Sequence, residues 1–210
     1  MSGVYVYIDG YNFYCGINRP GWLKYGWCNF SKLSKRLAER AFGSSFPVDE
    51  VKYYTAPVHL GPQENWRGES ERQKMWLDAV RAETPEVKII NGRWQKIGEK
   101  ERKEKETDVN IAVDMQYTDR SGRIILISGD SDFIPAIRAV RRAGIPVVVF
   151  LPPNKDRYKS PIDCPIRIEE IKKEDLVDCR LQDTISVPGK TPIRWSEYQA
   201  LRREVSLSRD

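Results

Sequence analysis

The sequence predicts a three-layer α/β/α domain built on a mainly parallel central sheet. Short β-branched and aromatic runs alternate with segments of helical periodicity, and some of these runs are almost continuously apolar. Continuously apolar strands are typical of a sheet that is covered on both faces, because a one-sided sheet alternates apolar and polar residues. The alternation of strands and helices also favours right-handed crossovers and therefore parallel strands.

The first half of the chain is predicted to hold three strands and two helices. Valine, isoleucine, tyrosine and threonine dominate the expected strands, and the longer segments between them carry apolar residues at helical spacing. Asn29 or Ser31 is expected to cap the first helix, and Gly43 is expected to end it. The predicted strands cover 4–8, 51–55 and 87–90, and the predicted helices cover about 30–41 and 67–83.

The second half repeats this alternation after a basic segment. Residues 93–105 are rich in charge and lack apolar periodicity, which indicates a solvated loop or a hairpin. A helix is expected to begin near Thr107 and to bury a face made of Val109, Ala112, Val113 and Gln116, widened by Ile111 and Met115. A strand at 123–128, a helix at 132–143 and a strand at 145–151 follow.

A change of character after residue 151 predicts the domain organisation. Four prolines between residues 152 and 165 interrupt the alternation, and the segment beyond them has weaker periodicity. A domain of about 150 residues can bury a complete core, so the chain is long enough for a core and an appendage. We therefore expect a core domain over residues 1–175 and a C-terminal extension over 176–210.

Composition excludes several kinds of chemistry. The chain holds 1 histidine, His59, which excludes Ser-His-Asp, Cys-His and multi-histidine metal sites. Its 4 cysteines contain no Cys-x-x-Cys spacing, which argues against zinc and against a disulfide framework. The net charge of +5 is compatible with an anionic partner where the basic residues cluster. Catalysis must then use carboxylates, lysine, tyrosine or a metal.

The sequence also carries expectations about location and assembly. No segment approaches the roughly 20 apolar residues of a membrane span, and the N-terminus lacks the basic and apolar stretches of a secretion signal. We therefore expect a cytoplasmic protein with no membrane partner. The sequence does not fix the oligomeric state, and a homo-oligomer is compatible with it.

Four aspartates are predicted to share one rim of the sheet. Asp9 follows the first strand, and Asp130 and Asp132 follow the strand at 123–128. Asp108 lies in the first turn of the preceding helix. Ligands of open parallel sheets bind beyond the carboxyl ends of the strands, which is where these residues are expected. Each aspartate alone is also typical of a helix cap or a turn. Asp114 lies about 240° around the helix from Asp108, so we expect it only to support the site.

Such a cluster predicts a metal and a reaction. Neighbouring carboxylates repel one another unless a cation lies among them, and hard oxygen ligands prefer Mg²⁺ or Mn²⁺ to zinc. Two such ions about 3.5–4 Å apart can activate water and stabilise the leaving oxygen in a displacement at phosphorus. The aspartates therefore predict metal-dependent hydrolysis of phosphodiester bonds.

Three segments resemble the signature motifs of one family: YIDGYNF at 7–13, KETDV at 105–109 and SGDSDF at 128–133. They are similar, in the expected order, to the motifs of NYN domains, a branch of the PIN-like metal-dependent ribonucleases, and the resemblance covers about residues 3–175. It implies a PIN-like fold, Mg²⁺ or Mn²⁺, and hydrolysis of single-stranded or structured RNA.

The resemblance also implies roles for individual residues. Asp9, Asp108 and Asp130 would be metal ligands. Asp132 would be a ligand or an outer carboxylate, and Asn12 would orient Asp9 or the substrate. The family pattern implies that Lys105 would face a phosphate of the substrate. Their charge or aromatic character suggests four further substrate contacts: Lys96, Lys100, Arg72 and Trp94. Mixed runs of Glu and Lys are also typical of ordinary solvated faces.

A second aromatic segment and the overall function leave alternatives open. Trp22, Tyr25 and Trp27 form a loop that could stack bases or pack against the C-terminal extension. The chain is predicted to be a ribonuclease, and the alternative is a non-catalytic RNA-binding or regulatory module of the same fold. The complete set of aspartates favours the enzyme, because buried carboxylates without a role are costly and tend to be replaced.

Overall fold

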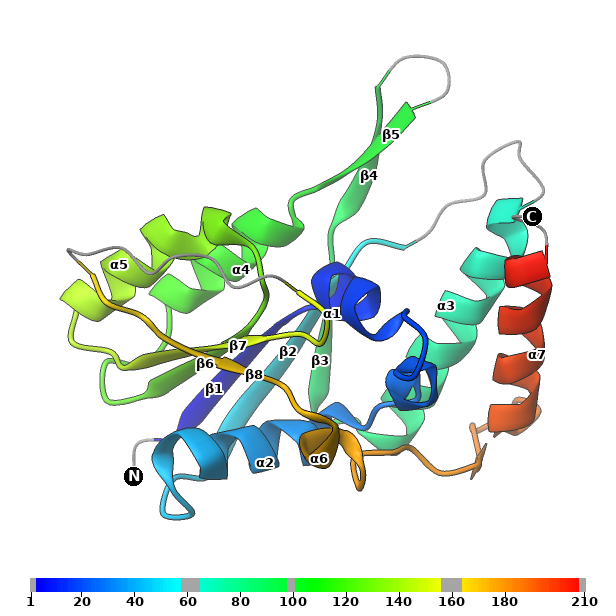
Figure 1. The fold of residues 1–210 in the computed structure, drawn as a ribbon, viewed down its shortest axis with the longest axis horizontal. Coiled ribbons are helices and arrows are strands. Elements are labelled where there is room, and N and C mark those ends of the chain that lie inside the picture. Colours follow the sequence, from blue (N-terminus) through cyan, green and yellow to red (C-terminus); the bar gives the residue numbers. More distant parts are fainter. Residues whose placement is uncertain (1–2, 58–64, 98–100, 156–163, 208–210) are drawn as a thin grey trace.

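The core of the protein is a parallel sheet with six strands in the part of the chain that the structure describes (Figure 1). The structure is a computed structural model. It describes the backbone over 3–57, 65–97, 101–155 and 164–207, and the side chains over 3–57, 70–93, 105–155 and 164–201. All five strand pairings are parallel, in the order β3-β2-β1-β6-β7-β8. The strands are β1 (Val4–Asp9), β2 (Val48–Thr55), β3 (Val87–Asn91), β6 (Arg123–Ile127), β7 (Val147–Leu151) and β8 (Arg167–Glu170).

Helices cover both faces of this sheet and divide the core into two clusters. Val6 and Ile8 point from β1 into a cluster with α2 (Phe30–Phe42) and α3 (Asn65–Glu83). Tyr7 points to the opposite face, into a cluster with α4 (Thr107–Gln116) and α5 (Ile134–Arg142). This alternation along a strand that is buried on both sides confirms the predicted three-layer α/β/α fold. The other helices are α1 (Gly10–Ile17), α6 (Lys173–Leu176) and α7 (Trp195–Leu207), with short 3-10 helices η1 (Leu23–Gly26) and η2 (Ser131–Phe133).

The basic segment forms a hairpin that projects from the sheet. Strands β4 (Arg93–Ile97) and β5 (Glu101–Lys105) pair with each other in an antiparallel register and stand away from the central sheet in Figure 1. Of the two conformations that the sequence permits, the hairpin is therefore the one that forms. No helix in the described part of the chain combines the length and the apolar character that crossing a bilayer requires.

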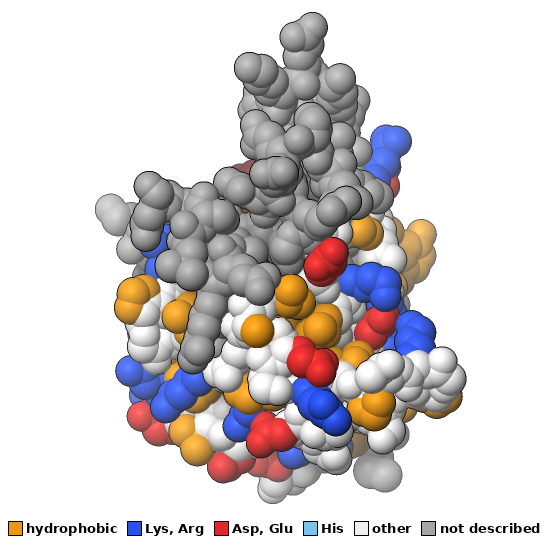
Figure 2. Space-filling model, turned by 90° about the vertical axis from the view of Figure 1, so that its right-hand side faces the viewer, with side chains coloured by type: hydrophobic (Ala, Val, Ile, Leu, Met, Phe, Trp, Pro, Cys, Tyr) orange, Lys and Arg blue, Asp and Glu red, His pale blue; other side chains and the backbone are white. Residues whose placement is uncertain are grey.

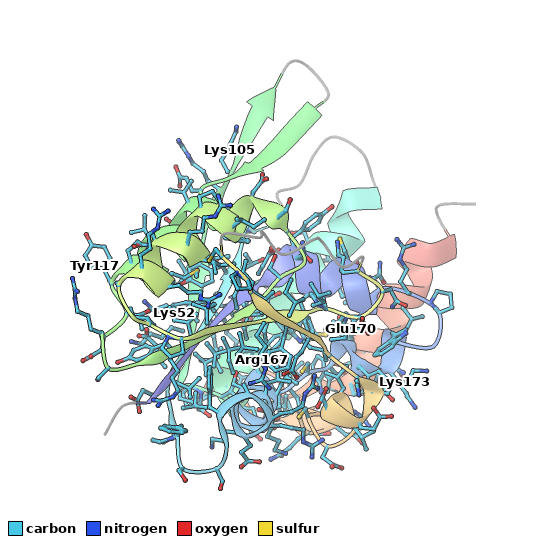
Figure 3. The ribbon with its side chains drawn as sticks, turned by 60° about the vertical axis from the view of Figure 1, so that its left-hand side comes forward. Lys52, Lys105, Tyr117, Arg167, Glu170 and Lys173 are labelled. Atoms are coloured by element: carbon cyan, nitrogen blue, oxygen red, sulfur yellow. The ribbon has the colours of Figure 1, made fainter. Side chains whose placement is uncertain are left out.

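The expected buried face of α4 is wrong. Ile111 and Met115 are fully buried, whereas the side chains of Val109 and Val113 are 62% and 46% exposed. Positions 109 and 111 lie about 200° apart around a helix, so only one of the two stripes can face the sheet. The longer side chains of Ile111 and Met115 occupy the side of α4 that faces the sheet, where they pack in the same cluster as Tyr7. Tyr117, just beyond α4, projects outward and is 83% exposed (Figure 3).

The C-terminal segment packs into the same core as α2 and α3. Trp27 is fully buried, with its ring centroid 5.6 Å from that of Trp195 and 5.0 Å from that of Tyr198 on α7. The Trp27 indole N–H donates to the carbonyl of Gln182 at 2.9 Å. Trp27 therefore packs against the C-terminal segment, which is one of the two roles that the sequence left open. The boundary at residue 175 stays a prediction.

Replacing Trp27 should destabilise the fold and loosen the C-terminal segment. Trp27→Ala removes a fully buried ring and one hydrogen bond, and we expect a loss of about 3–5 kcal/mol in the free energy of unfolding. Urea denaturation measures this loss, and limited proteolysis reports on the region beyond residue 175. Trp22→Ala, at a partly buried position of the same loop, should cost less than half as much. Equal losses in the two variants would contradict the packing described here.

Candidate active site

The strand order reverses between β1 and β6. From β1 the chain proceeds outward through β2 and β3 in one direction, and β6, β7 and β8 continue in the other. Open α/β sheets bind ligands at such a reversal, beyond the carboxyl ends of the strands. Asp9 is the last residue of β1, and Ser128 to Asp130 connect β6 to η2. The sheet topology thus brings two of the three predicted motifs together.

Asp9 joins these two loops. Its side chain is 5% exposed, and its Oδ1 accepts a hydrogen bond from the backbone N–H of Asn12 at 2.9 Å. Its Oδ2 accepts one from the Ser128 hydroxyl, also at 2.9 Å. The first bond caps α1, and the second fixes the carboxylate relative to the loop after β6. A side chain at Gly10 would place its Cβ 2.4 Å from the carbonyl oxygen of Tyr54, so only glycine lets α1 begin this close to β2.

Asn12 and Asp130 fix the loop after β6. The side-chain oxygen of Asn12 accepts from the backbone N–H of Gly129 at 3.0 Å, and the N–H of Asp130 donates to the Ser128 hydroxyl at 3.1 Å. One Asp130 oxygen accepts from the N–H of Asp132 at 2.9 Å and caps η2. It is the backbone of Asn12 that orients Asp9, while its side chain holds the neighbouring loop.

Asp108 faces the same carboxylates from α4. Its side chain reaches solvent, yet the surrounding protein displaces enough water to raise the pKa of its carboxyl above the usual value. The negative charges of Asp130 and Asp132 raise that pKa further. Asp108 therefore interacts electrostatically with Asp130 and Asp132, and hydrogen bonds connect Asp130 through Ser128 to Asp9.

A strained turn leads from the hairpin into α4. Glu106 adopts a left-handed backbone conformation with φ of 75°, which costs a non-glycine residue about 1–2 kcal/mol. An ion pair with Arg93 at the other side of the hairpin base holds Glu106 in place. Lys105 is the last residue of β5 and stands directly before the turn that precedes Asp108 (Figure 3). Lys105 and Asp108 thus lie on either side of this turn, three residues apart in the sequence.

The donor chemistry of the site fits a hard divalent cation. All four candidate ligands, Asp9, Asp108, Asp130 and Asp132, offer carboxylate oxygens, which hard divalent ions prefer. In the described residues, however, no three or more acidic, histidine or cysteine side chains are arranged around a common point as a finished metal site. Binding an ion therefore requires the carboxylates to converge further.

Asp114 has a structural role. Its Oδ2 accepts a 2.6 Å hydrogen bond from the Tyr54 hydroxyl and lies 3.2 Å from Nζ of Lys52. Burial, and then the hydrogen bond to this carboxylate, raise the pKa of Tyr54, so the phenol stays protonated and donates. These contacts attach α4 to β2, and the support of Asp114 for the site stays a prediction.

Lys155 lies beside the loop after β6, and sequence reasoning missed it. A Cβ built on Gly129 would be 3.1 Å from Cβ of Lys155 and 3.3 Å from the side-chain oxygen of Asn12. Lys155 follows the carboxyl end of β7, the neighbour of β6 in the sheet. The sequence did offer one signal, because Lys155 follows a predicted buried strand. Only the strand order shows that this strand, β7, lies beside β6.

The predicted substrate contacts are not tested by the structure. Arg72 on α3 is 6% exposed; its guanidinium lies 5.4 Å from the Tyr14 ring centre and donates to the Tyr14 hydroxyl. Its neighbour Gln73 donates to the carbonyl of Ala56 at 3.0 Å, which places this part of α3 near the carboxyl end of β2. The side chains of Trp94 and Lys96, and residue Lys100 as a whole, lie outside the described residues. All of these contacts stay predictions.

The fold and site together define an α/β protein whose aspartates gather where the strand order reverses. The NYN domain family matches residues 3–163, so the chain belongs to that family of PIN-like nucleases, as its motifs indicated. No curated protein matches the chain. Among solved structures, a protein of unknown function from Vibrio parahaemolyticus is 20% identical, with a TM-score of 0.49 and with 83% of this chain and 95% of that chain covered.

Exchanging Asp114 should separate structural support from metal binding. Asp114→Asn replaces a charge-assisted hydrogen bond by a neutral one, so we expect a loss of about 1 kcal/mol, or roughly 2–4 °C in the thermal midpoint. The added stability that Mn²⁺ provides should be retained in Asp114→Asn and lost in Asp130→Asn. Thermal unfolding with and without Mn²⁺ measures both effects. Loss of the Mn²⁺ effect in Asp114→Asn alone would make Asp114 a ligand.

Proposed function

We propose that the protein is a metal-dependent ribonuclease that hydrolyses phosphodiester bonds of single-stranded or structured RNA. The observation that carries this proposal is the hydrogen-bonded link between Asp9 and Asp130, which come from two separate segments, at the reversal of the strand order. Membership of a family of PIN-like nucleases supports it. The charges of Asp130 and Asp132 also act on Asp108, at the start of α4.

Asp9, Asp108 and Asp130 would hold Mg²⁺ or Mn²⁺, with Asp132 as a further ligand or an outer carboxylate. A bound ion of this kind supplies an activated water and stabilises charge on the leaving oxygen. The residues of the chain prepare the site for it. Ser128 and the backbone of Asn12 orient the Asp9 carboxylate.

Two lysines are suited to hold the substrate beside these carboxylates. Lys105 stands at the base of the hairpin next to the turn before Asp108, and Lys155 stands beside Gly129 on the β7 side. Phosphate contacts from lysine position a strand without reading its sequence. An RNA backbone that passes between them would cross the carboxylates, and its negative charge would otherwise be repelled there.

A non-catalytic RNA-binding module is the second candidate. It is favoured by one observation: the described carboxylates are not yet arranged around a common point. In that case the aspartates would serve the hydrogen-bonded scaffold, and the basic residues would still bind RNA. Cleavage assays on the same purified protein separate the two functions.

Removing one carboxylate should abolish cleavage while leaving RNA binding intact. Asp9→Asn and Asp130→Asn keep the side-chain shape but remove the charge that holds a metal, so we expect cleavage rates at least about 100-fold lower. Initial rates with Mg²⁺, Mn²⁺ or EDTA, followed by mapping of the product ends, measure this. Asp114→Asn is the matched control and should keep its activity. Near-wild-type cleavage by a folded Asp130→Asn protein would exclude this mechanism, and RNA binding without cleavage by the wild type would favour the binding module.

The hairpin should contribute electrostatic binding. Replacing Lys96, Lys100 and Lys103 by Gln removes up to three phosphate contacts, each of which contributes roughly −0.7 to the slope of log affinity against log salt for a single strand. We expect weaker binding and a slope that is flatter by about 2, measured by titration at several salt concentrations in EDTA. Lys35→Gln on the outer face of α2 serves as the control and should leave the slope unchanged. An unchanged slope in the triple variant would make the hairpin an ordinary solvated face.

A further inference from the structure

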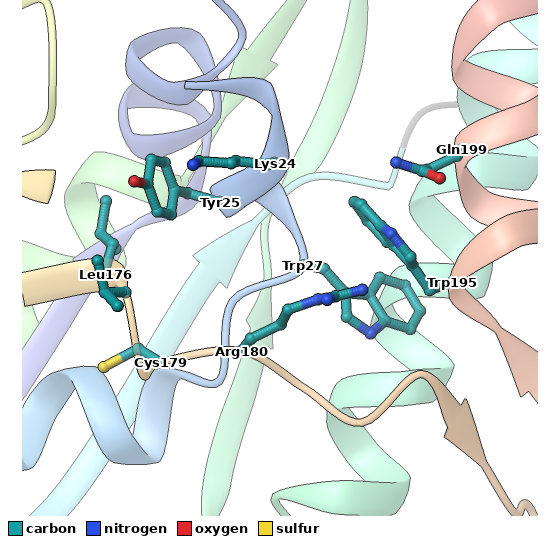
Figure 4. A pocket seen from close by; sticks show the side chains of 9 residues that line it. Lys24, Tyr25, Trp27, Leu176, Cys179, Arg180, Trp195 and Gln199 are labelled. Carbon is teal, nitrogen blue, oxygen red and sulfur yellow. The ribbon is translucent and has the colours of Figure 1, made fainter. Parts of the chain in front are cut away.

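A pocket of about 270 Å³ lies between η1, the segment after α6 and the start of α7 (Figure 4). In Figure 4, Lys24 and Tyr25 come from η1 on one side, and Trp195 and Gln199 come from α7 on the other. Trp27 and Arg180 lie between these two walls. The lining is completed by Leu176, Val177 and Cys179. The C-terminal segment therefore supplies more than half of the lining residues.

The lining combines aromatic faces with positive charge. Nζ of Lys24 lies 5.1 Å from the centre of the Tyr25 ring, and the guanidinium carbon of Arg180 lies 4.9 Å from the centre of the Trp195 ring. None of the residues that line the pocket is acidic. Elsewhere on the face that carries α7, hydrophobic, basic and acidic side chains are interspersed (Figure 2). The pocket thus departs from the mixed character of its surroundings.

This combination matches the chemistry of a nucleotide. A nucleobase stacks on aromatic rings and on planar guanidinium groups, and its phosphate binds to cations. The amide of Gln199 adds both a donor and an acceptor, the two groups that base edges present.

We propose that the pocket binds one unpaired nucleotide of the RNA strand whose scissile phosphate lies at the carboxylates, an inference that rests on the proposed function. Helix α1 begins directly after Asp9, and its eight residues extend about 12 Å toward η1. That length corresponds to three or four stacked nucleotides. A strand that lies along α1 therefore leads from the carboxylates toward η1 and the pocket, and the C-terminal segment acquires a role in substrate binding.

Arg180 is available for this contact. Its ion pair with Asp183 joins two exposed side chains three residues apart, and such surface pairs are weak. A phosphate can therefore compete for the guanidinium. Arg194 pairs with Glu197 at the same spacing, is also exposed and does not line the pocket. Arg194 thus provides a matched control within the same segment.

The test compares a ten-nucleotide single-stranded RNA with a dinucleotide, because only the longer strand can reach from the carboxylates to the pocket. In the wild type the longer RNA should have a KM at least about fivefold lower, the smaller end of the effect of stacking one base. A double variant of Lys24→Gln and Arg180→Gln should lose this advantage, with kcat and the KM of the short RNA unchanged. Tyr25→Leu should lose part of it. The matched control is a double variant of Lys35→Gln and Arg194→Gln, which should behave as the wild type.

Dissociation constants of both RNAs in EDTA separate this inference from the proposed function. If the length advantage persists in the pocket variant, or falls equally in the control, the pocket does not bind the strand. If the wild type cleaves neither RNA but binds the longer one more tightly, and only the pocket variant loses that preference, the pocket assignment holds and the nuclease proposal fails. Thermal midpoints within a few degrees of the wild type establish that each variant is folded.

Discussion

The Asp9 carboxylate is the contact on which the arrangement of the site depends. It is buried, it accepts one hydrogen bond from the start of α1 and one from the loop after β6, and it lies where the strand order reverses. Burying a carboxylate is costly unless hydrogen bonds compensate, and here the same two bonds that satisfy it also connect the loops. Ser128, held by Asp9, receives the N–H of Asp130. The orientation of one carboxylate is thus transmitted to the next.

Most of the fold could be predicted because its signals are local. The apolar runs identified the central strands, and the alternation of strands and helices identified the layers. Periodicity alone could not choose the buried face of α4, since Val109 and Val113 form as regular a stripe as Ile111 and Met115. The choice depends on which side chains fill the space above Tyr7, and that space is formed by residues distant in sequence. The role of Trp27 was undecided for the same reason, because its partners lie on α7.

The candidate site could be predicted in part. Asp9 and Asp130 follow recognisable strands, so the rule that parallel strands share a carboxyl rim was sufficient to place them together. The position of Lys155 beside Gly129 could not be predicted by this rule alone. It follows from the pairing of β7 with β6, which the sequence did not specify. The hydrogen bond that Asn12 makes to Gly129 depends on a side-chain rotamer, and no spacing pattern encodes it. The pocket beside α7 could not be predicted from the sequence either, since it forms only when the C-terminal segment packs against η1.

The central claim is that the carboxylates at this rim bind a divalent metal. A crystal structure of the protein with Mn²⁺, analysed by anomalous scattering, tests it most directly. The account predicts a manganese peak at about 2.0–2.2 Å from carboxylate oxygens of Asp9, Asp108 and Asp130, distances typical of hard divalent ions with oxygen ligands. A protein that cleaves RNA with Mn²⁺ in the same solution, but whose crystals show no manganese at these three residues, would contradict it.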